Sequence, residues 1–424
     1  MSHEYLLVES AGPLHGEVAL SGAKNAVLVI MASLILTKGK SILTNVPPSE
    51  DVFQMILLLR ELGAIVEFNE LEEKVTVDTA PISNYRVSLD IMKKMRASIL
   101  VMGPLLARFG KAEIALPGGC LIGTRPIDYH LRAFAKMGVT IELQGDNLKA
   151  SAEKLSATKF VLEYPSVGAT ENILMAASLT SGTTEILNAA LEPEVFDLIA
   201  VLTKMGASIV VYGPATIIIN GVSQLNPIEH SIMYDRLEAG TFLLAAAITG
   251  GSISLPQAPA SSMDVFLEAL RDMGHEVIVG NNGVGISLKA TLSPKAISFK
   301  TMPYPGFPTD LQAPMMVAQS LASGTSVVVE TVFENRLIHI RELQKMGAQI
   351  TIDGLTATVV GVEQLYGAQV IASDIRAGAA LVLAGLVAKG QTTITGLHHL
   401  RRGYNDLEGK LRKLGAKISL HKEK

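Results

Sequence analysis

The 424-residue chain has only one cysteine, Cys120, so it cannot form an intramolecular disulfide, as is typical of proteins from a reducing compartment. No apolar stretch reaches the roughly 20 residues that a membrane-spanning helix needs. The most apolar stretches, such as 240–251 and 377–388, predict buried helices instead. Residues 1–11 carry two glutamates and lack the basic segment and apolar core of a secretory signal. We therefore expect a cytoplasmic protein with no membrane partner.

The chain also has no excess of positive charge. It carries 36 Lys and Arg against 40 Asp and Glu, a net charge of −4, which argues against nucleic acid as a partner. A few convergent cationic side chains could still bind an anionic small molecule. The nine histidines lack metal-ligand spacing, since the adjacent His398 and His399 point in different directions. There is no Walker loop or dinucleotide fingerprint, so we expect neither a metal nor another cofactor.

The length and composition predict two large cores. A 48% apolar and 18% charged chain can fold as a globular protein, and 424 residues predict two domains of about 200 residues each. Gln224–Ser231, near the midpoint, has little hydrophobic periodicity and contains Asn226 and Pro227. We expect the domain boundary in this stretch.

One pattern occurs six times. A helical stretch ends in a Leu-Gly or Met-Gly pair whose glycines lie 68 to 75 residues apart: Gly63, Gly138, Gly206, Gly274, Gly347 and Gly415. A second glycine precedes each of these by 23 to 28 residues: Gly39, Gly110, Gly182, Gly251, Gly324 and Gly390. Glycine after a helix supplies the left-handed conformation that ends it. Each repeat is therefore predicted to contain a helix, a strand, a second helix, a second strand and a third strand, in that order.

The elements of a unit can be predicted from hydrophobic periodicity. Apolar residues of 52–62 share one helix face, and Ser49 is a plausible N-cap for this helix. Alternating or β-branched stretches predict strands at 41–46, 64–68, 183–187, 325–329 and 348–352. A period near 70 residues exceeds that of the usual solenoids. We therefore expect two closed α/β lobes of three units, with small-residue helices inside and sheets outside.

Three regions depart from the repeat and contain candidate functional residues. Leu116–Pro126 holds three glycines, Cys120 and Arg125, which suits a mobile loop with a thiol that the arginine activates. Lys24, at a predicted helix start, could bind phosphate, and Asp310 follows a Phe-Pro-Thr sequence. Four arginines stand at corresponding ends of units and suit carboxylate or phosphate: Arg96, Arg336, Arg376 and Arg402.

Each region also has a structural interpretation. The loop could be a glycine-rich turn with an incidental buried cysteine, and Lys24 could be an exposed helix-start lysine. Asp310 could cap a helix that begins at Leu311. Any of the arginines could form an ordinary surface ion pair.

These motifs, in this order, resemble those of the UDP-N-acetylglucosamine 1-carboxyvinyltransferases, which are enolpyruvyl transferases, over residues 16 to 416. The resemblance rests on Ser21–Ala26, Met95–Ser98, the Cys120 loop through Asp128, Ser166–Thr170, Asp235–Thr241, Phe307–Asp310, Glu330–Arg336 and Arg402–Tyr404. It implies a two-lobed inside-out α/β barrel of six βαβαββ-like units, three per lobe. The N-terminal lobe would span 21–229 and the C-terminal lobe 1–20 plus 230–424, with the active site in the cleft between them.

The resemblance also implies a reaction. The family transfers the enolpyruvyl group of phosphoenolpyruvate to the 3-hydroxyl of UDP-N-acetylglucosamine by addition–elimination, with release of phosphate. This is the first committed step of the peptidoglycan precursor synthesis on which cell shape and division depend. Such chemistry needs an acid, a base and cations around an anionic centre.

Site roles follow by matched position. Cys120 would donate a proton and form an adduct, also with the antibiotic fosfomycin, and Asp310 would accept the proton of the sugar hydroxyl. Lys24, Arg125 and Arg402 would hold phosphoenolpyruvate. The nucleotide-sugar site would be lined by Asn25, Arg96, Arg125, Pro126, Ile127, Asp128, Tyr129, Ser166, Val167, Gly168 and Val332, with Arg336 and Arg376 steering substrate or sealing the site. Cationic neighbours favour the thiolate of Cys120 whereas a proton donor must be a thiol, so both forms stay open.

Three alternatives stand beside this interpretation. The sister enzymes that use shikimate 3-phosphate share the fold, but the Cys120 loop and the Lys24-Asn25 pair favour the nucleotide sugar. A regulatory paralogue without turnover would not need Lys24, Cys120, Asp310 and Arg402 together. A purely structural repeat protein would have no reason to keep a cysteine in a glycine-rich loop. Glu163–Pro165 departs from the family, which often has a basic residue there.

Overall fold

The computed structural model describes residues 4–115 and 127–422, which form two compact units. The N-terminal unit comprises residues 22–115 and 127–233, and the C-terminal unit comprises 4–21 and 234–422. The N-terminal segment thus belongs with the second half of the chain. Over the described ranges, no helix is both long enough and apolar enough to cross a bilayer.

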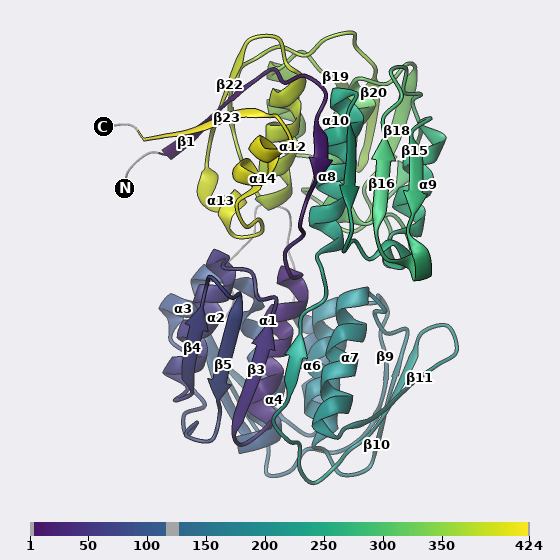
Figure 1. Ribbon diagram of the computed structural model, residues 1–424. Coiled ribbons are helices and arrows are strands. Elements are labelled where there is room, and N and C mark those ends of the chain that lie inside the picture. The colour runs from purple at the N-terminus through teal and green to yellow at the C-terminus, as the bar shows by residue number, and fades with distance from the viewer. Residues whose placement is uncertain (1–3, 116–126, 423–424) are drawn as a thin grey trace. The chain divides into compact units, whose positions relative to one another are not determined.

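The N-terminal unit alternates helices and short strands (Figure 1). Its elements are α1 (Lys24–Ser33), η1 (Leu34–Leu36), β3 (Lys40–Thr44), α2 (Glu50–Glu61), β4 (Ile65–Asn69), β5 (Lys74–Asp78), α3 (Leu89–Lys94), η2 (Arg96–Val101), α4 (Met102–Phe109), β6 (Lys111–Ala115), α5 (Asp128–Lys136), β7 (Thr140–Gln144), β8 (Asn147–Ser151), β9 (Lys159–Val161), α6 (Val167–Ser178), β10 (Thr183–Leu187), α7 (Pro193–Met205), β11 (Ser208–Tyr212), β12 (Thr216–Asn220) and β13 (Glu229–Ser231).

The C-terminal unit follows the same order after two N-terminal strands. Its elements are β1 (Glu4–Glu9), β2 (His15–Glu17), α8 (Arg236–Thr249), β14 (Ser252–Leu255), η3 (Ala260–Ser262), α9 (Asp264–Asp272), β15 (Glu276–Val279), η4 (Asn281–Gly283), β16 (Ile286–Lys289), β17 (Phe299–Lys300), η5 (Thr309–Leu311), α10 (Gln312–Ser320), β18 (Thr325–Val329), α11 (Ile340–Lys345), β19 (Gln349–Asp353), β20 (Thr356–Val360), β21 (Gln369–Ile371), α12 (Ile375–Val387), β22 (Gln391–Thr395), α13 (Leu397–Arg401), α14 (Leu407–Lys413) and β23 (Lys417–Lys422).

The periodicity located these elements well. The strands expected at 183–187 and 325–329 are β10 and β18 with the same bounds, while β4 and β19 each begin one residue later than expected. Helix α2 has Ser49 at its N-cap position, but the side chain makes no capping hydrogen bond. The first turn of α2 therefore relies on Glu50 and Asp51 rather than on a serine cap.

The six glycines of the Leu-Gly and Met-Gly pairs end helices as predicted. All six have φ between +88° and +109°. In the other set only Gly110 is a helix C-cap, and Gly39, Gly182, Gly324 and Gly390 lie two or three residues past the C-cap residue of the preceding helix. Gly251 does not adopt a positive φ, because the left-handed C-cap of α8 is its neighbour Gly250, at +71°. Gly251 is needed for a different reason, since a Cβ there would lie 2.1 Å from the carbonyl oxygen of Leu14.

Edge strands link the three sheets of the N-terminal unit in a closed cycle. The sheets have the strand orders β13-β3-β5-β4, β6-β8-β7 and β11-β12-β10-β9. Arg86, after the first sheet, forms a parallel bridge with Glu113 of β6, and β9, after the second sheet, pairs in parallel with β10. Strand β13, after the third sheet, returns to pair in parallel with β3. Each repeat thus hydrogen-bonds to the next, and the third to the first.

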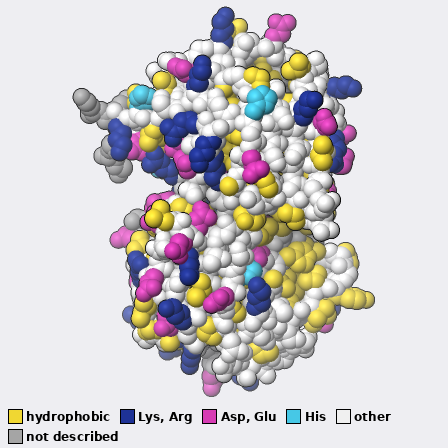
Figure 2. Space-filling model, in the orientation of Figure 1, with side chains coloured by type: hydrophobic (Ala, Val, Ile, Leu, Met, Phe, Trp, Pro, Cys, Tyr) yellow, Lys and Arg dark blue, Asp and Glu magenta, His cyan; other side chains and the backbone are white. Residues whose placement is uncertain are grey.

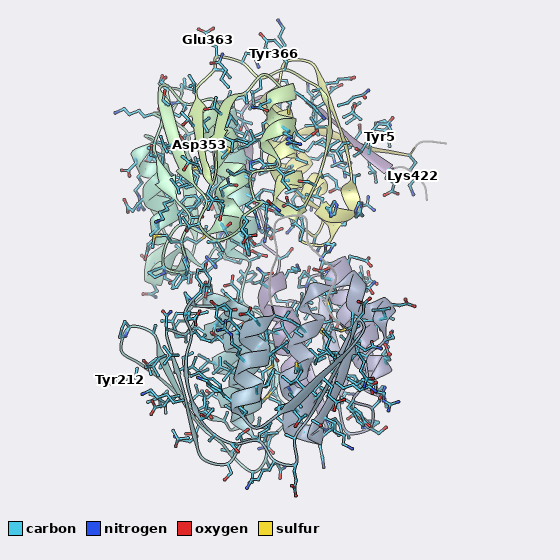
Figure 3. All side chains as sticks on the ribbon, turned by 180° about the vertical axis from the view of Figure 1, so that it is seen from behind. Tyr5, Tyr212, Asp353, Glu363, Tyr366 and Lys422 are labelled. Atoms are coloured by element: carbon cyan, nitrogen blue, oxygen red, sulfur yellow. The ribbon has the colours of Figure 1, made fainter. Side chains whose placement is uncertain are left out.

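The C-terminal unit closes in the same way. Parallel edge pairs join β17 to β18, β21 to β22 and β2 to β14. Strand β1 lies antiparallel between β22 and β23, the position that the last strand of the repeat itself occupies in the other sheets. Figure 3 shows Tyr5 and Lys422 on the neighbouring strands β1 and β23. The beginning of the chain therefore completes the sixth repeat.

The helices between the sheets are buried almost all round. In α8, α10 and α12 nearly all residues are buried, and these three helices contact one another (Figure 1). Close packing there requires small residues, because a Cβ at Gly385 would lie 2.9 Å from Val8. The two apolar stretches noted in the sequence are thus the buried helices α8 and α12, as predicted.

Strands of both units, such as β5, β12 and β20, bury one face in the core of their own unit and expose the other, in the alternating pattern of half-buried sheets. The exposed face is not uniformly polar. Val161, Val210 and Tyr212 are more than half exposed on the β9–β12 sheet, and Figure 2 shows hydrophobic side chains at the surface of this region. Tyr212, labelled in Figure 3, projects from the hairpin between β11 and β12.

Candidate functional site

Part of the predicted site lies outside the described residues. Cys120, Arg125 and Pro126 fall within 116–126, and the side chain of Arg96 is likewise not described. The remaining predicted residues divide between the two units.

The Ser21–Ala26 motif anchors the start of α1. The Ser21 amide donates to Glu238 Oε2 at 2.7 Å, and its hydroxyl accepts from Lys410 Nζ at 2.8 Å. Gly22 has no room for a side chain, because a Cβ would lie 1.8 Å from the carbonyl oxygen of Asn45. Burial raises the pKa of Glu238, although Lys410, 2.8 Å from its Oε1, opposes that shift. The backbone before α1 is therefore held by a buried hydrogen-bond network.

Lys24 is the first residue of α1, as predicted, and is not the exposed lysine of the structural interpretation. Its side chain is 13% exposed, and its Nζ lies 2.6 Å from Oδ2 of Asp51 on α2. Asn25, beside it, is exposed. The Asp51 carboxylate of the neighbouring helix therefore holds the Lys24 ammonium group at the start of α1.

Residues of the predicted nucleotide-sugar site gather at the starts of α5 and α6. Ile127 is the N-cap residue of α5, which begins at Asp128 and Tyr129, and the three are half-buried. Ser166 caps α6 by accepting a hydrogen bond from the Ala169 amide, so Val167 and Gly168 form its first turn.

A buried histidine joins these two helix starts. The Nδ1 of His130 lies 2.9 Å from the side-chain nitrogen Nδ2 of Asn172. The same Nδ2 donates to the Ile99 carbonyl in η2. A Cβ at Gly168 would lie only 3.2 Å from the His130 ring. The segments 128–130, 166–168 and η2, which begins at Arg96, are therefore packed side by side in the N-terminal unit.

In the C-terminal unit, Asp310 is bound by two arginines. Its Oδ1 accepts from Arg336 Nη2 at 2.8 Å, and its Oδ2 accepts from Arg376 Nε and Nη2 at 3.1 and 3.0 Å. The arginine side chains are 3% and 5% exposed and the aspartate 25%. Asp310 thus does not cap a helix, and these arginines are not surface ion pairs. Two guanidinium groups orient the carboxylate and stabilise its charged form.

Tyr404 also contacts Arg376. The Arg376 guanidinium lies 5.3 Å from the centre of the Tyr404 ring, a cation–π geometry. Burial alone would lower the pKa of Arg376, but Tyr404, Asp310 and Asp235 raise it above its ordinary value. Burial raises the pKa of Tyr404 itself. Arg376 is therefore a permanently charged, fixed group.

Arg402 lies two residues before Tyr404 in the chain. It is half-buried and forms the C-cap of α13, which packs against α12 near Arg376. At Gly403, a Cβ would lie 2.4 Å from the side chain of Ile375. The Arg402-Gly403-Tyr404 motif thus keeps a cation next to the start of α12.

One residue quoted in the motifs has a role that the sequence did not reveal. Glu330 follows β18, is fully buried and accepts hydrogen bonds from the amides of Val332 and Phe333 and from the hydroxyls of Thr301 and Thr309. The sequence did contain one sign of this role, namely a charged residue directly after the apolar strand 325–329. Across residues 4–115 and 127–422, no three His, Cys, Asp or Glu side chains gather as metal ligands would.

Comparison with known proteins places this geometry in a family. Residues 8–411 match the family model described as EPSP synthase (3-phosphoshikimate 1-carboxyvinyltransferase). UDP-N-acetylglucosamine 1-carboxyvinyltransferase 1 of Caldanaerobacter subterraneus subsp. tengcongensis is 48% identical over 412 residues, covering 97% of this chain and 98% of that protein. The UDP-N-acetylglucosamine 1-carboxyvinyltransferase of Desulfosudis oleivorans is 49% identical over 413 residues, with the same coverage. This chain belongs to the UDP-N-acetylglucosamine 1-carboxyvinyltransferase family.

Solved structures have the same fold as this member of the UDP-N-acetylglucosamine 1-carboxyvinyltransferase family. The crystal structure of the enolpyruvyl transferase NikO from Streptomyces tendae matches with a TM-score of 0.90 at 25% identity, over 100% of both chains. EPSP synthase from Acinetobacter baumannii matches with a TM-score of 0.78 at 18% identity, over 99% of this chain and 100% of that one. The mixed α/β fold predicted from the sequence is therefore that of the enolpyruvyl transferases.

Proposed function

We propose that this chain is an enzyme that transfers the enolpyruvyl group of phosphoenolpyruvate to the 3-hydroxyl of UDP-N-acetylglucosamine and releases phosphate. The observation that carries the proposal is 46–49% identity, over 97% to 99% of the chain, to five proteins named for this activity. The reaction is the first committed step of peptidoglycan precursor synthesis. The enzyme needs no metal or other cofactor for it, and its cytoplasmic location stays a prediction of the sequence.

The proposed roles of the described residues fit their surroundings. Asp310, held as a carboxylate by Arg336 and Arg376, accepts the proton of the attacking hydroxyl. Lys24 and Arg402 bind the phosphate and carboxylate of phosphoenolpyruvate as charge-assisted hydrogen-bond donors. The addition forms a tetrahedral intermediate, from which phosphate leaves.

The sugar nucleotide has a plausible binding surface in the N-terminal unit. The first turn of α6, at Ser166–Gly168, presents backbone N–H groups that suit an anionic group. Asn25, Arg96, Ile127, Asp128, Tyr129 and Val332 are further residues proposed to bind the nucleotide sugar. Cys120, Arg125 and Pro126 complete the proposal, with Cys120 as the proton donor and the target of fosfomycin.

We also propose that each unit is an inside-out α/β barrel, with three repeats in each lobe. The closed cycles of edge-strand pairs and the buried helices support this description. Both units supply residues to the reaction, so neither is expected to be active alone.

The decisive test is phosphate release from phosphoenolpyruvate by the purified protein, with UDP-N-acetylglucosamine or shikimate 3-phosphate as acceptor. We expect release only with the nucleotide sugar and its loss after pre-treatment with fosfomycin. Release only with shikimate 3-phosphate would assign the chain to the sister activity. Binding of the nucleotide sugar without any release would favour a regulatory protein.

Replacing Lys24 should weaken phosphoenolpyruvate binding more than turnover. A charge-assisted hydrogen bond contributes about 1.5–3 kcal/mol, so Lys24→Ala should raise the KM for phosphoenolpyruvate roughly 10- to 100-fold. Steady-state kinetics with saturating UDP-N-acetylglucosamine measure this change. The exposed Lys38, also in the N-terminal unit, is a suitable control, and Lys38→Ala should leave the KM unchanged. An unaltered KM in Lys24→Ala would remove Lys24 from the substrate site.

A further inference from the structure

Glu330 is a buried charge for which the proposed chemistry has no direct use. It stands between the end of β18 and the segment 331–336, and its side chain is completely buried. A carboxylate in such a place is costly unless donors satisfy both oxygens. The donors that Glu330 binds therefore indicate what it does.

Its two oxygens bind different parts of the site. Oε1 accepts from the Val332 amide at 2.8 Å, the Phe333 amide at 3.1 Å and the Thr301 hydroxyl at 2.9 Å. Oε2 accepts from the hydroxyl of Thr309 at 2.9 Å. Thr309 directly precedes Asp310, while Val332 and Phe333 lead to Arg336. One carboxylate thus connects the segment of the proton acceptor to the segment of its arginine partner.

A second contact strengthens the same junction. The Thr331 amide donates to the Thr301 hydroxyl at 3.0 Å, and the Thr331 hydroxyl donates to the Thr301 carbonyl. Thr301 therefore holds Thr331 directly and also donates to Glu330 Oε1. By contrast, among the described residues, Glu330 accepts only one hydrogen bond from the Asp310 segment, that of the Thr309 hydroxyl.

We infer that Glu330 is a positioning residue, which acts through Thr309 to hold Asp310 in register with Val332 and Arg336. This inference rests on the proposed function, because Asp310 must act as the proton acceptor for its position to matter. A base that is misplaced by about 1 Å can lose on the order of 100-fold in rate, so one hydrogen bond at this point can affect catalysis strongly. Glu330 itself touches no reacting atom.

The test is a double-mutant cycle on Thr309 and Glu330, assayed by phosphate release. Thr309→Val removes the hydroxyl and should lower kcat about tenfold or more, with the KM for UDP-N-acetylglucosamine changed less than about threefold. Thr309→Ser keeps the hydroxyl and should retain wild-type kcat. Adding Glu330→Gln to Thr309→Val should lower kcat little further, because the hydroxyl through which Glu330 acts is then already absent.

Controls separate positioning from stability. Thr180→Val removes a buried hydroxyl that donates to the Ala176 carbonyl in the N-terminal unit, and it should lower Tm without changing kcat. Thr309→Ala, which removes the same hydroxyl without adding a methyl group, takes the place of Thr309→Val should that variant not fold.

Three outcomes would overturn the inference. The first is a kcat of the folded Thr309 variant within about twofold of wild type. The second is additive losses in the double mutant, which would mean that Thr309 acts on substrate by itself. Both would leave the proposed function intact. The third is a wild-type protein without enolpyruvyl transfer, which would overturn the proposed function as well.

Discussion

Asp310→Asn should lower kcat for enolpyruvyl transfer by about 10²- to 10⁴-fold, the usual contribution of a general base. The amide keeps the shape of the side chain but cannot accept the proton of the sugar hydroxyl. Binding of UDP-N-acetylglucosamine, measured by calorimetry, should weaken far less than turnover. Single-turnover kinetics at saturating substrate would separate the chemical step from binding.

The same substitution should also destabilise the C-terminal unit. A neutral amide in place of the Asp310 carboxylate would leave Arg336 and Arg376, which are 3% and 5% exposed, without a counter-charge on this side. Removing one partner of a buried ion pair costs about 3–5 kcal/mol, and the 25% exposure of Asp310 places the expected loss at the lower end. Asp310→Glu, which keeps the charge, is the control for stability. Turnover within about threefold of wild type in folded Asp310→Asn would exclude Asp310 as the base.

The arginines around Asp310 illustrate what sequence patterns can and cannot provide. The motifs singled out Asp310, Arg336 and Arg376 separately, but the two arginines lie 26 and 66 residues from the aspartate along the chain. Only the packing of α12 against α10, which directly follows η5, brings Arg376 to Asp310, and the segment after β18 brings Arg336. Local reasoning therefore favoured a helix cap for Asp310, since Asp after Pro-Thr is a frequent cap.

Elements with a strong period were predictable. Strand β10 and strand β18 were placed to the residue because their apolar alternation and the preceding glycine act over a few residues. Glu330 shows the opposite case. Its four donors come from three segments, and no spacing rule indicates which hydroxyls and amides a buried carboxylate will meet. The sequence motif placed Glu330 near Val332 and Arg336, but only the structure shows which donors it binds.

Gly361→Ala should cause a large loss of stability for the addition of a single methyl group. A Cβ at Gly361 would lie 1.7 Å from the carbonyl oxygen of Ala322, a distance that backbone cannot tolerate. The Gly361 amide also donates to the Gly324 carbonyl at 3.0 Å, so moving the strand end breaks a hydrogen bond. We expect a loss of about 3–5 kcal/mol, more than the ~1–3 kcal/mol of ordinary overpacking, because backbone atoms cannot move aside as a side chain can.

Calorimetry of the full chain should detect this change. For a unit of about 200 residues, 3–5 kcal/mol corresponds to a fall in Tm of roughly 10 °C. Gly12→Ala, where nothing lies within 4 Å of the added carbon, should leave Tm unchanged. Gly354→Ala has equally open space but φ of +59°, so it should cost only about 1–2 kcal/mol.

The internal repeat makes the same prediction at a second site. Gly221 occupies the matching position after β12, where a Cβ would lie 1.7 Å from the Thr180 carbonyl and the amide donates to Gly182 at 3.0 Å. Gly221→Ala should therefore lower the Tm of the N-terminal unit by a similar amount. Because the two glycines repeat one contact in different units, the two losses should add in the double variant. Equal Tm values for Gly361→Ala and Gly12→Ala would show that the strand end can move, and would contradict the steric argument at both sites.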